Sequence, residues 1–242
     1  MFTNRFSRVL VGVLAISVML ITGATQANSS GQLTGKTICV DPGHGGLDSG
    51  AHNAVYGVSE SDINLDEAYA LRALLEGAGA TVVMTRTGDK AMTEAERAAF
   101  CNRSQSDILI SVHTNSFADA EPNGSLVFYG KRSAQEDVRL AQAVHGTLYP
   151  ALQRTAPAPA AFTDFGVRRF GAGVLRRSSM PAALVEPAFL SNPAEAVLLA
   201  APIYTAPGSG VFSKGCPALS CRRGQIATAI YQGLLTFFRD ES

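Results

Sequence analysis

Several residue types are scarce in this chain, and their scarcity excludes some classes of protein. The 242 residues include no Trp, and only 17% are charged, with 20 Lys and Arg balanced by 20 Asp and Glu. A net charge of zero excludes the global basic field of a nucleic-acid-binding domain. Because Trp is absent, any aromatic surface on which a sugar stacks must use Phe or Tyr. Because 46% hydrophobic residues is too high for a disordered chain, we expect a packed globular protein that binds no nucleic acid.

The apolar stretch near the N-terminus is short for a membrane span. It covers residues 9–21, follows two arginines, and precedes the small residues Thr25 and Ala27. This order of features is typical of a secretory signal peptide. We therefore predict a signal peptide over residues 1–27 and export to the periplasm or to the extracellular cell wall, with an uncleaved anchor as the alternative.

Only four cysteines are present, and an even number in an exported protein permits disulfides. Cys216 and Cys221 lie close together in a stretch rich in Gly, Pro and Ser, so we predict a bridge between them. Cys39 and Cys101 lie in an expected strand and an expected helix, and the sequence leaves open whether they are bridged or are buried thiols.

Apolar patterns along residues 28–242 predict strands that alternate with helices in one domain. Strands are expected at 37–41, 81–85, 108–113, 126–129, 174–176 and 182–186, and helices at 62–76, 93–103, 134–152, 195–200 and 226–238. Such alternation predicts an α/β sandwich with a mostly parallel sheet. Residues 201–224 are rich in Pro, Gly and Ser, and we interpret them as a surface insertion.

Two histidines and two glutamates lie at the ends of these predicted elements. His44 follows the first strand, His113 closes the third, Glu60 precedes the first long helix, and Glu186 ends the last strand. Because the carboxyl ends of parallel strands share one edge of the sheet, we expect these side chains to converge. Two His and one Glu are a recognised ligand set for catalytic zinc. A further carboxylate could transfer protons.

Each of these residues has a simpler interpretation when taken alone. A His at a strand end is more often structural than a ligand, and Glu60 could simply favour the positive end of a helix. Glu186 is less easily explained, because an acid that closes an apolar run is costly when buried without a partner. The glycines around His44 match neither phosphate-binding pattern. The functional interpretation therefore depends on the combination of residues.

Five segments, taken in order, resemble the zinc-dependent N-acetylmuramoyl-L-alanine amidases with a type 3 catalytic domain. The resemblance covers roughly residues 36–238. The segments are VDPGHGGLDSGA (40–51), ESDINL (60–65), VVMTRTGD (82–89), ISVHTNS (110–116) and MPAALVEPAFLSN (180–192).

The resemblance implies a role for each of the four residues. His44, Glu60 and His113 become the ligands of one Zn²⁺ per chain, and Glu186 becomes the catalytic acid/base. The expected fold is a three-layer α/β sandwich with a mostly parallel sheet of about six strands, flanked by helices. The expected reaction is hydrolysis of the amide between N-acetylmuramic acid and L-alanine in peptidoglycan, which lies outside the inner membrane and so agrees with export.

Other positions qualify this interpretation. Asn115 is two residues after His113, on the same face of a strand, and could contact substrate or support a ligand. Arg86 could likewise contact substrate or support a ligand, although an ion pair with Asp89 is the simpler explanation. The family usually has a non-Pro residue and then Gly after the catalytic Glu, whereas residues 187–188 are Pro-Ala here, which removes a backbone donor.

Two alternatives share the predicted site. One is a wall-binding or regulatory module that has lost activity, and the other is a zinc peptidase that cuts within the stem peptide. We expect a monomer that acts on peptidoglycan, with an activator or targeting protein as a further partner. Some family members carry a helix that plugs the zinc site, and we expect none between Asn115 and Pro181.

Overall fold

The computed structural model describes residues 31–130, 135–201 and 221–240. The predicted signal peptide over residues 1–27 lies outside the described residues, as does most of the predicted insertion over 201–224. Helix α6 begins at Arg222, within the last residues of the predicted insertion. No helix among the described residues is long and apolar enough to cross a membrane.

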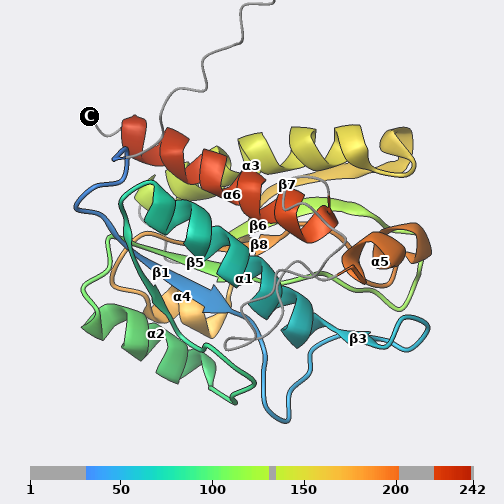
Figure 1. Ribbon diagram of the computed structural model, residues 1–242, viewed down its shortest axis with the longest axis horizontal. Coiled ribbons are helices and arrows are strands. Elements are labelled where there is room, and N and C mark those ends of the chain that lie inside the picture. The colour runs from blue at the N-terminus through green and yellow to red at the C-terminus, as the bar shows by residue number, and fades with distance from the viewer. Residues whose placement is uncertain (1–30, 131–134, 202–220, 241–242) are drawn as a thin grey trace, which may run out of the picture.

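A six-stranded sheet forms the centre of the molecule, in the order β4-β1-β5-β8-β6-β7 (Figure 1). The strands are β1 (Thr37–Pro42), β4 (Thr81–Met84), β5 (Ile108–Val112), β6 (Gly124–Gly130), β7 (Thr163–Phe170) and β8 (Ala182–Glu186). The first four in the sheet order are parallel, whereas β6 pairs antiparallel with β8 and parallel with β7. A small separate hairpin pairs β2 (His52–Asn53) with β3 (Val58–Ser59). The predicted mostly parallel α/β sheet is confirmed.

Helices cover both faces of this sheet. One layer contains α1 (Glu60–Gly77), α3 (Gln135–Thr155) and α6 (Arg222–Arg239), and the other contains α2 (Glu94–Arg103) and α4 (Gly173–Arg177). The short α5 (Pro193–Leu199) and the 3₁₀ turn η1 (Pro159–Ala161) lie in connections. Figure 1 shows α1, α3 and α6 together on one side of the strands. This arrangement confirms the three-layer sandwich.

The alternation of side chains along the strands explains the two layers. Ile38 and Val40 of β1 are fully buried in the larger apolar cluster with α1, α3 and α6, whereas Cys39 between them is buried in the cluster with α2 and α4. Successive residues of a strand point to opposite faces of the sheet. A central strand covered on both faces must therefore be apolar throughout, and this continuous run made β1 predictable.

Two elements differ from the prediction. The predicted strand over 174–176 is the helix α4, whose Val174 and Leu175 are buried on the α2 side. The prediction was wrong because a segment of three residues is too short to show a period. The strand β7 was missed. It is an edge strand with exposed or half-buried residues and a central Gly166, so it has no buried apolar run. The total of six strands holds, although one of them was wrongly identified.

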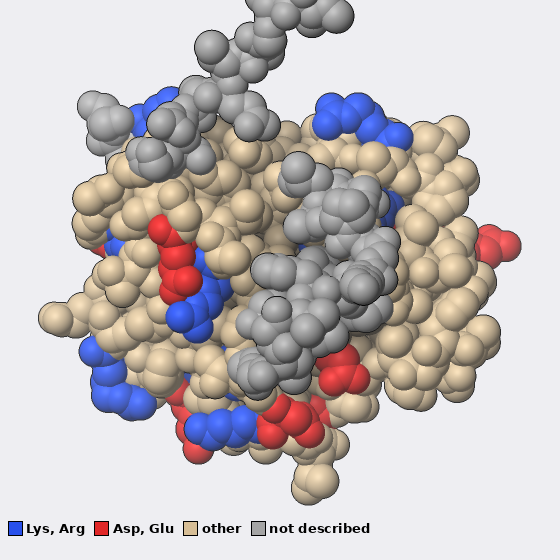
Figure 2. All heavy atoms as spheres, viewed as in Figure 1, with Lys and Arg blue, Asp and Glu red and all other residues tan. Residues whose placement is uncertain are grey.

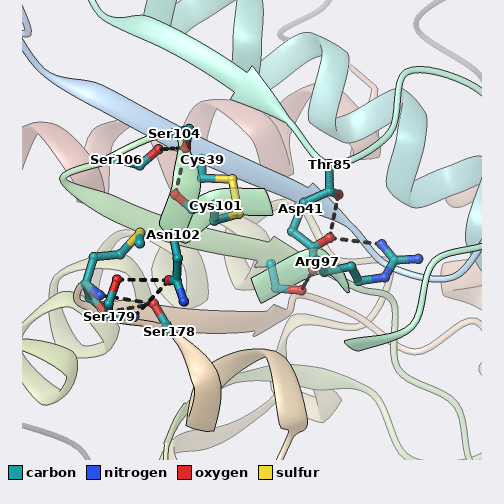
Figure 3. The surroundings of a disulfide bond; sticks show 12 residues. Cys39, Asp41, Thr85, Arg97, Cys101, Asn102, Ser104, Ser106, Ser178 and Ser179 are labelled. Carbon is teal, nitrogen blue, oxygen red and sulfur yellow. Dashed lines mark hydrogen bonds and ion pairs between the residues drawn. A yellow bond between two sulfur atoms is a disulfide. The ribbon is translucent and has the colours of Figure 1, made fainter. Parts of the chain in front are cut away.

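A disulfide joins Cys39 of β1 to Cys101 of α2, across a sequence separation of 62 (Figure 3). This result decides between the two possibilities that the sequence left open. Cys221 is a buried free thiol, which contradicts the predicted bridge to Cys216; Cys216 itself lies outside the described residues. Cys221 is the residue before the first turn of α6, where it packs as a small apolar side chain.

Charged side chains are dispersed on the face shown in Figure 2, where Lys and Arg occupy separate places and several of them lie next to Asp or Glu. This face carries no extended basic surface, in agreement with the zero net charge. The remaining question is what the buried charges do.

Candidate metal centre

The structure brings three of the predicted residues together at one edge of the sheet. His44 follows β1, His113 follows β5, and Glu60 is the first residue of α1. One ligand atom from each of the three lies within 4.8 Å of the others. Ser59 caps α1 by accepting a hydrogen bond from the Asp62 backbone, so the helix begins where Glu60 can reach both imidazoles.

The two imidazoles share a single carboxylate oxygen. Glu60 Oε1 lies 3.1 Å from His44 Nε2 and 3.0 Å from His113 Nδ1. The rings meet edge to face, with centroids 4.9 Å apart. Two nitrogen ligands and one oxygen ligand that converge from three elements can bind a zinc ion and leave a position for water. The donor set therefore fits a catalytic zinc site.

Asp48 orients one of these imidazoles. His44 Nδ1 donates a hydrogen bond to Asp48 Oδ2 at 2.9 Å, which leaves Nε2 as the nitrogen that faces Glu60. Carboxylates in this position commonly fix the tautomer and the ring orientation of metal-binding histidines. The sequence analysis missed Asp48. The available signal was its position four residues after His44, inside a segment that already carried the family resemblance.

Backbone donors and the histidines hold Glu60 in its ionised form. The Thr114 N–H donates to Oε1 at 3.2 Å and the Ala51 N–H donates to Oε2 at 3.0 Å. Burial raises the pKa of Glu60, but hydrogen bonds with His113 and His44 outweigh it and keep the pKa far below its ordinary value. Burial lowers the pKa of His44, but its contact with Glu60 outweighs that effect and leaves the pKa raised.

Two glycines leave room for the ligands. A Cβ on Gly43 would lie 2.3 Å from His113 Cε1, inside the space of the ring. A Cβ on Gly50 would lie 2.6 Å from Glu60 Oε2, and Gly50 also has a φ of +64° that L residues rarely adopt. Any side chain at either position would displace a ligand.

Glu186 ends β8 and lines the same cleft as His44, Glu60 and His113, a cavity of about 560 Å³. Its Oε2 atom is buried and has no hydrogen-bond partner. Burial raises the pKa of Glu186 well above the ordinary range, and the nearby charge of Glu60 raises it further. The residue is thus a carboxyl group placed to exchange protons beside the three ligands.

Arg86 supports the loop that carries His44. Its Nε donates to the Pro42 carbonyl at 3.0 Å, and its Nη2 donates to the carbonyls of Gly43 and Ser61, each at 2.8 Å. Burial, together with the charge of Arg97, lowers the pKa of Arg86 to about 10. These contacts are those of a residue that supports the ligand loop, one of the roles considered from the sequence.

Asn115 lies beside the segment that follows Glu186. The Asn115 N–H donates to the Ala188 carbonyl at 2.9 Å, and Asn115 lines the cleft. The paired register of β8 ends at Glu186, so Pro187 lies beyond the strand pairing and its missing N–H removes no hydrogen bond from the paired strands. The Pro187 carbonyl accepts a hydrogen bond from Ser125 Oγ at 2.8 Å.

Among the described residues between Asn115 and Pro181, α3 is the one long helix. The short α4 contributes Val174 to the cleft wall, and no further long helix lies between Asn115 and Pro181 in the part of the chain that the structure describes.

Comparisons with known proteins agree with this geometry. Residues 38–208 match the family described as N-acetylmuramoyl-L-alanine amidase. The germination-specific N-acetylmuramoyl-L-alanine amidase of Bacillus subtilis is 30% identical over 223 residues, which are 86% of this chain and 82% of that protein. N-acetylmuramoyl-L-alanine amidase LytC of the same organism is 30% identical over 96% of this chain, but the match spans only 43% of LytC.

Solved structures show the same fold. An N-acetylmuramoyl-L-alanine amidase from Clostridium difficile 630 is similar with a TM-score of 0.71 and 28% identity, covering 86% of this chain and 98% of that one. The CwlD amidase from Clostridioides difficile, solved in complex with the GerS lipoprotein, has a TM-score of 0.68 and 27% identity, covering 85% and 99%.

Proposed function

The chain belongs to the N-acetylmuramoyl-L-alanine amidase family of peptidoglycan hydrolases, and on this premise we propose that it cuts its amide bond with one zinc ion and Glu186. The reaction is hydrolysis of the bond between the lactyl group of N-acetylmuramic acid and L-alanine. The observation that carries the proposal is the convergence of His44, Glu60 and His113 within 4.8 Å, beside a buried carboxyl group.

Three side chains would hold the metal through His44 Nε2, His113 Nδ1 and Glu60 Oε1. When bound, Zn²⁺ lowers the pKa of a coordinated water to about 7 and polarises the substrate carbonyl. Asp48 keeps His44 in the tautomer with Nε2 free for this role.

Glu186 moves the proton in this proposal. A zinc ion bound beside Glu186 would favour its ionised form, and this carboxylate accepts a proton from the attacking water while the water oxygen bonds to the lactyl carbonyl carbon. The same carboxyl group then donates that proton to the alanine nitrogen as the carbon–nitrogen bond breaks. The products are a lactyl carboxylic acid on the glycan and a stem peptide with a free amino group. Asn115 is proposed to contact the substrate from the cleft wall.

The location and partners follow from the substrate. Zinc-dependent action on peptidoglycan, together with the predicted signal peptide, supports a periplasmic or extracellular enzyme. Because the CwlD relative was solved with a lipoprotein, an activator or targeting protein is part of the proposal. We propose a monomeric catalytic domain.

The test is digestion of purified peptidoglycan with and without a chelator, followed by mass analysis of the released fragments. Free stem peptides that begin with L-alanine, lost with the chelator and restored by Zn²⁺, support the proposal. Cuts within the stem peptide would identify a peptidase. Zinc binding without any release would favour a required activator or a binding module, and reverting Pro187 would then be the next experiment.

A further inference from the structure

A buried ion pair lies beneath the loop that carries His44, and the proposed reaction does not use it. Arg97 of α2 and Asp41 of β1 are 5% and 0% exposed, and Arg97 Nη1 lies 2.9 Å from Asp41 Oδ1. Asp41 also accepts hydrogen bonds from Thr85 Oγ1 at 2.5 Å and from Ser111 Oγ at 2.7 Å (Figure 3). These partners come from three neighbouring chain segments and hold the carboxylate in one position.

The guanidinium of Arg97 continues from this anchor to the metal loop. It donates to the Pro42 carbonyl through Nη1 and to the His44 carbonyl through Nη2, both at 2.6 Å. Its Nε donates to the Met92 carbonyl at 3.1 Å. A planar fork can make these bonds together, whereas a lysine ammonium cannot span the same acceptors.

The residue whose carbonyl is held in this way, His44, has an unfavourable backbone conformation. His44 has a φ of 60°, in the left-handed region that non-glycine L residues seldom adopt. Such a conformation persists where surrounding contacts enforce it. A charge-assisted bond to the His44 carbonyl is a contact of this kind, because it fixes the peptide plane next to the Cα that carries the imidazole.

The helix that carries Arg97 is itself attached to β1 at a second point. A capping box of Thr93 and Glu96 fixes the first turn of α2. The disulfide joins Cys101, one turn beyond Arg97, to Cys39, which shares a face of β1 with Asp41. The covalent and the ionic cross-link therefore join the same two elements side by side.

We propose that Arg97 is a positioning residue for the metal: by holding the His44 carbonyl, it keeps His44 Nε2 directed at Glu60 and His113. This inference rests on the proposed zinc chemistry. Groups that orient metal ligands from outside commonly change metal affinity by about 10- to 100-fold when altered. The zinc affinity should therefore fall by this factor when the guanidinium of Arg97 is replaced by an ammonium group, which keeps the positive charge.

The experiment measures the dissociation constant for Zn²⁺ by competition with a chromogenic chelator. The test variant is Arg97→Lys, and the matched control is Arg223→Lys. Arg223 is also a buried arginine, 4% exposed, that lies 2.8 Å from Asp66 and donates to the Leu199 carbonyl at 2.6 Å. It joins α6 to α1 through Asp66 and bonds to the Leu199 carbonyl rather than to the metal loop, so its variant reproduces the loss of a buried guanidinium alone.

Weaker zinc binding in Arg97→Lys, with wild-type binding in Arg223→Lys, supports the inference. Unchanged zinc affinity in Arg97→Lys overturns it, even where KM rises, since that result would indicate a direct substrate contact. Equal weakening in both variants also overturns it. If the wild-type protein binds no zinc, the proposed function itself fails, and that failure is visible before any variant is measured. Should Arg97→Lys not fold, the double variant D41N/R97Q, which removes both charges, is titrated in the same way.

Discussion

Glu186 at the metal centre and Glu67 in α1 lie in two different regions but share two properties, a buried oxygen without a partner and a raised pKa. Each has at least one buried oxygen without a hydrogen-bond partner, and for Glu67 this is true of both oxygens. Burial raises the pKa of both well above the ordinary range. Burial and protonation alone would therefore nominate both as catalytic acids.

The surroundings of the two groups separate them. Glu186 lines an open cleft beside His44, Glu60 and His113, where water and substrate can reach it. Glu67 is fully buried, and after burial the largest influences on its pKa are the charges of Arg223 and Asp66. A raised pKa thus marks a catalytic acid only where the carboxyl group also reaches solvent and a reacting atom.

Substitution of Glu186 should give the largest effect. Glu186→Gln keeps the shape of the side chain but cannot accept the proton of the attacking water, so we expect kcat to fall by about 10²- to 10⁴-fold. Glu67→Gln is the matched control and should keep the wild-type rate. Release of stem peptides from peptidoglycan measures both, while zinc titration should show unchanged binding. A wild-type rate in Glu186→Gln would remove the distinction between the two carboxyl groups.

The disulfide should have the next largest effect, on stability. Replacing Cys39 and Cys101 by Ala removes a cross-link with a sequence separation of 62, and we expect a loss of about 2–4 kcal/mol in the free energy of unfolding. The free thiol Cys221, on the α6 side near Arg222, provides the control as Cys221→Ala, which should cost less. Urea unfolding measures both. A larger loss in the control would show that the α6 region, not the β1–α2 pair, limits stability.

Removing the hydrogen bond from His44 to Asp48 should have a moderate effect, which is confined to the zinc affinity. The Asp48 side chain is 70% exposed, so Asp48→Ala should leave stability close to wild type. Because the Nδ1 hydrogen bond is lost, zinc affinity should fall by about 10- to 100-fold. Chelator competition measures the zinc affinity, and urea unfolding measures the stability. Unchanged affinity would mean that the tautomer is fixed without Asp48.

Substitution of Glu67 should have the smallest effect. This effect is a change in the free energy of unfolding that depends on pH. Its folded-state pKa is raised, so above the ordinary pKa of about 4.5 the unfolded chain ionises while the folded group stays neutral. The associated stability is present at lower pH and is lost as the pH rises towards the folded-state pKa. Glu67→Met should therefore stabilise the protein by about 1–3 kcal/mol near pH 8 and by much less near pH 4.

Urea unfolding at both pH values measures this difference, and the rate of peptidoglycan hydrolysis should stay at the wild-type level. Loss of hydrolysis in Glu67→Met would show that the α1–α6 region supports the metal centre after all. A pH-independent change in stability would show that the carboxyl group of Glu67 is not protonated in the folded protein.

Most of the fold was predictable because the central strands are covered on both faces. Residues 37–41, 108–113 and 182–186 are continuous apolar runs, and the structure has a strand in each. The edge strand β7 has no such run, because its side chains are partly exposed. A segment as short as Val174 and Leu175 fits a strand or a helix equally well, so only packing against α2 made it helical.

The positions of His44, Glu60, His113 and Glu186 were predictable for a similar reason. Each lies at the end of a local pattern, and parallel strands bring those ends to one edge of the sheet. Their convergence follows from topology alone, without side-chain detail. Local sequence signals could not identify Arg97, because its four acceptors lie in segments that approach one another only after α2 packs on β1.

The sequence by itself thus determined the fold class, the family and the residues that converge, because these depend on residue type and on local periodicity. Only the tertiary structure decided that Cys39 pairs with Cys101, that Asp48 orients His44, and that Arg86 supports a loop. Glu67 was likewise an ordinary helix residue until α1 packed against α6. Such contacts depend on register and packing between separate elements, and no local pattern records which side chains will then face one another.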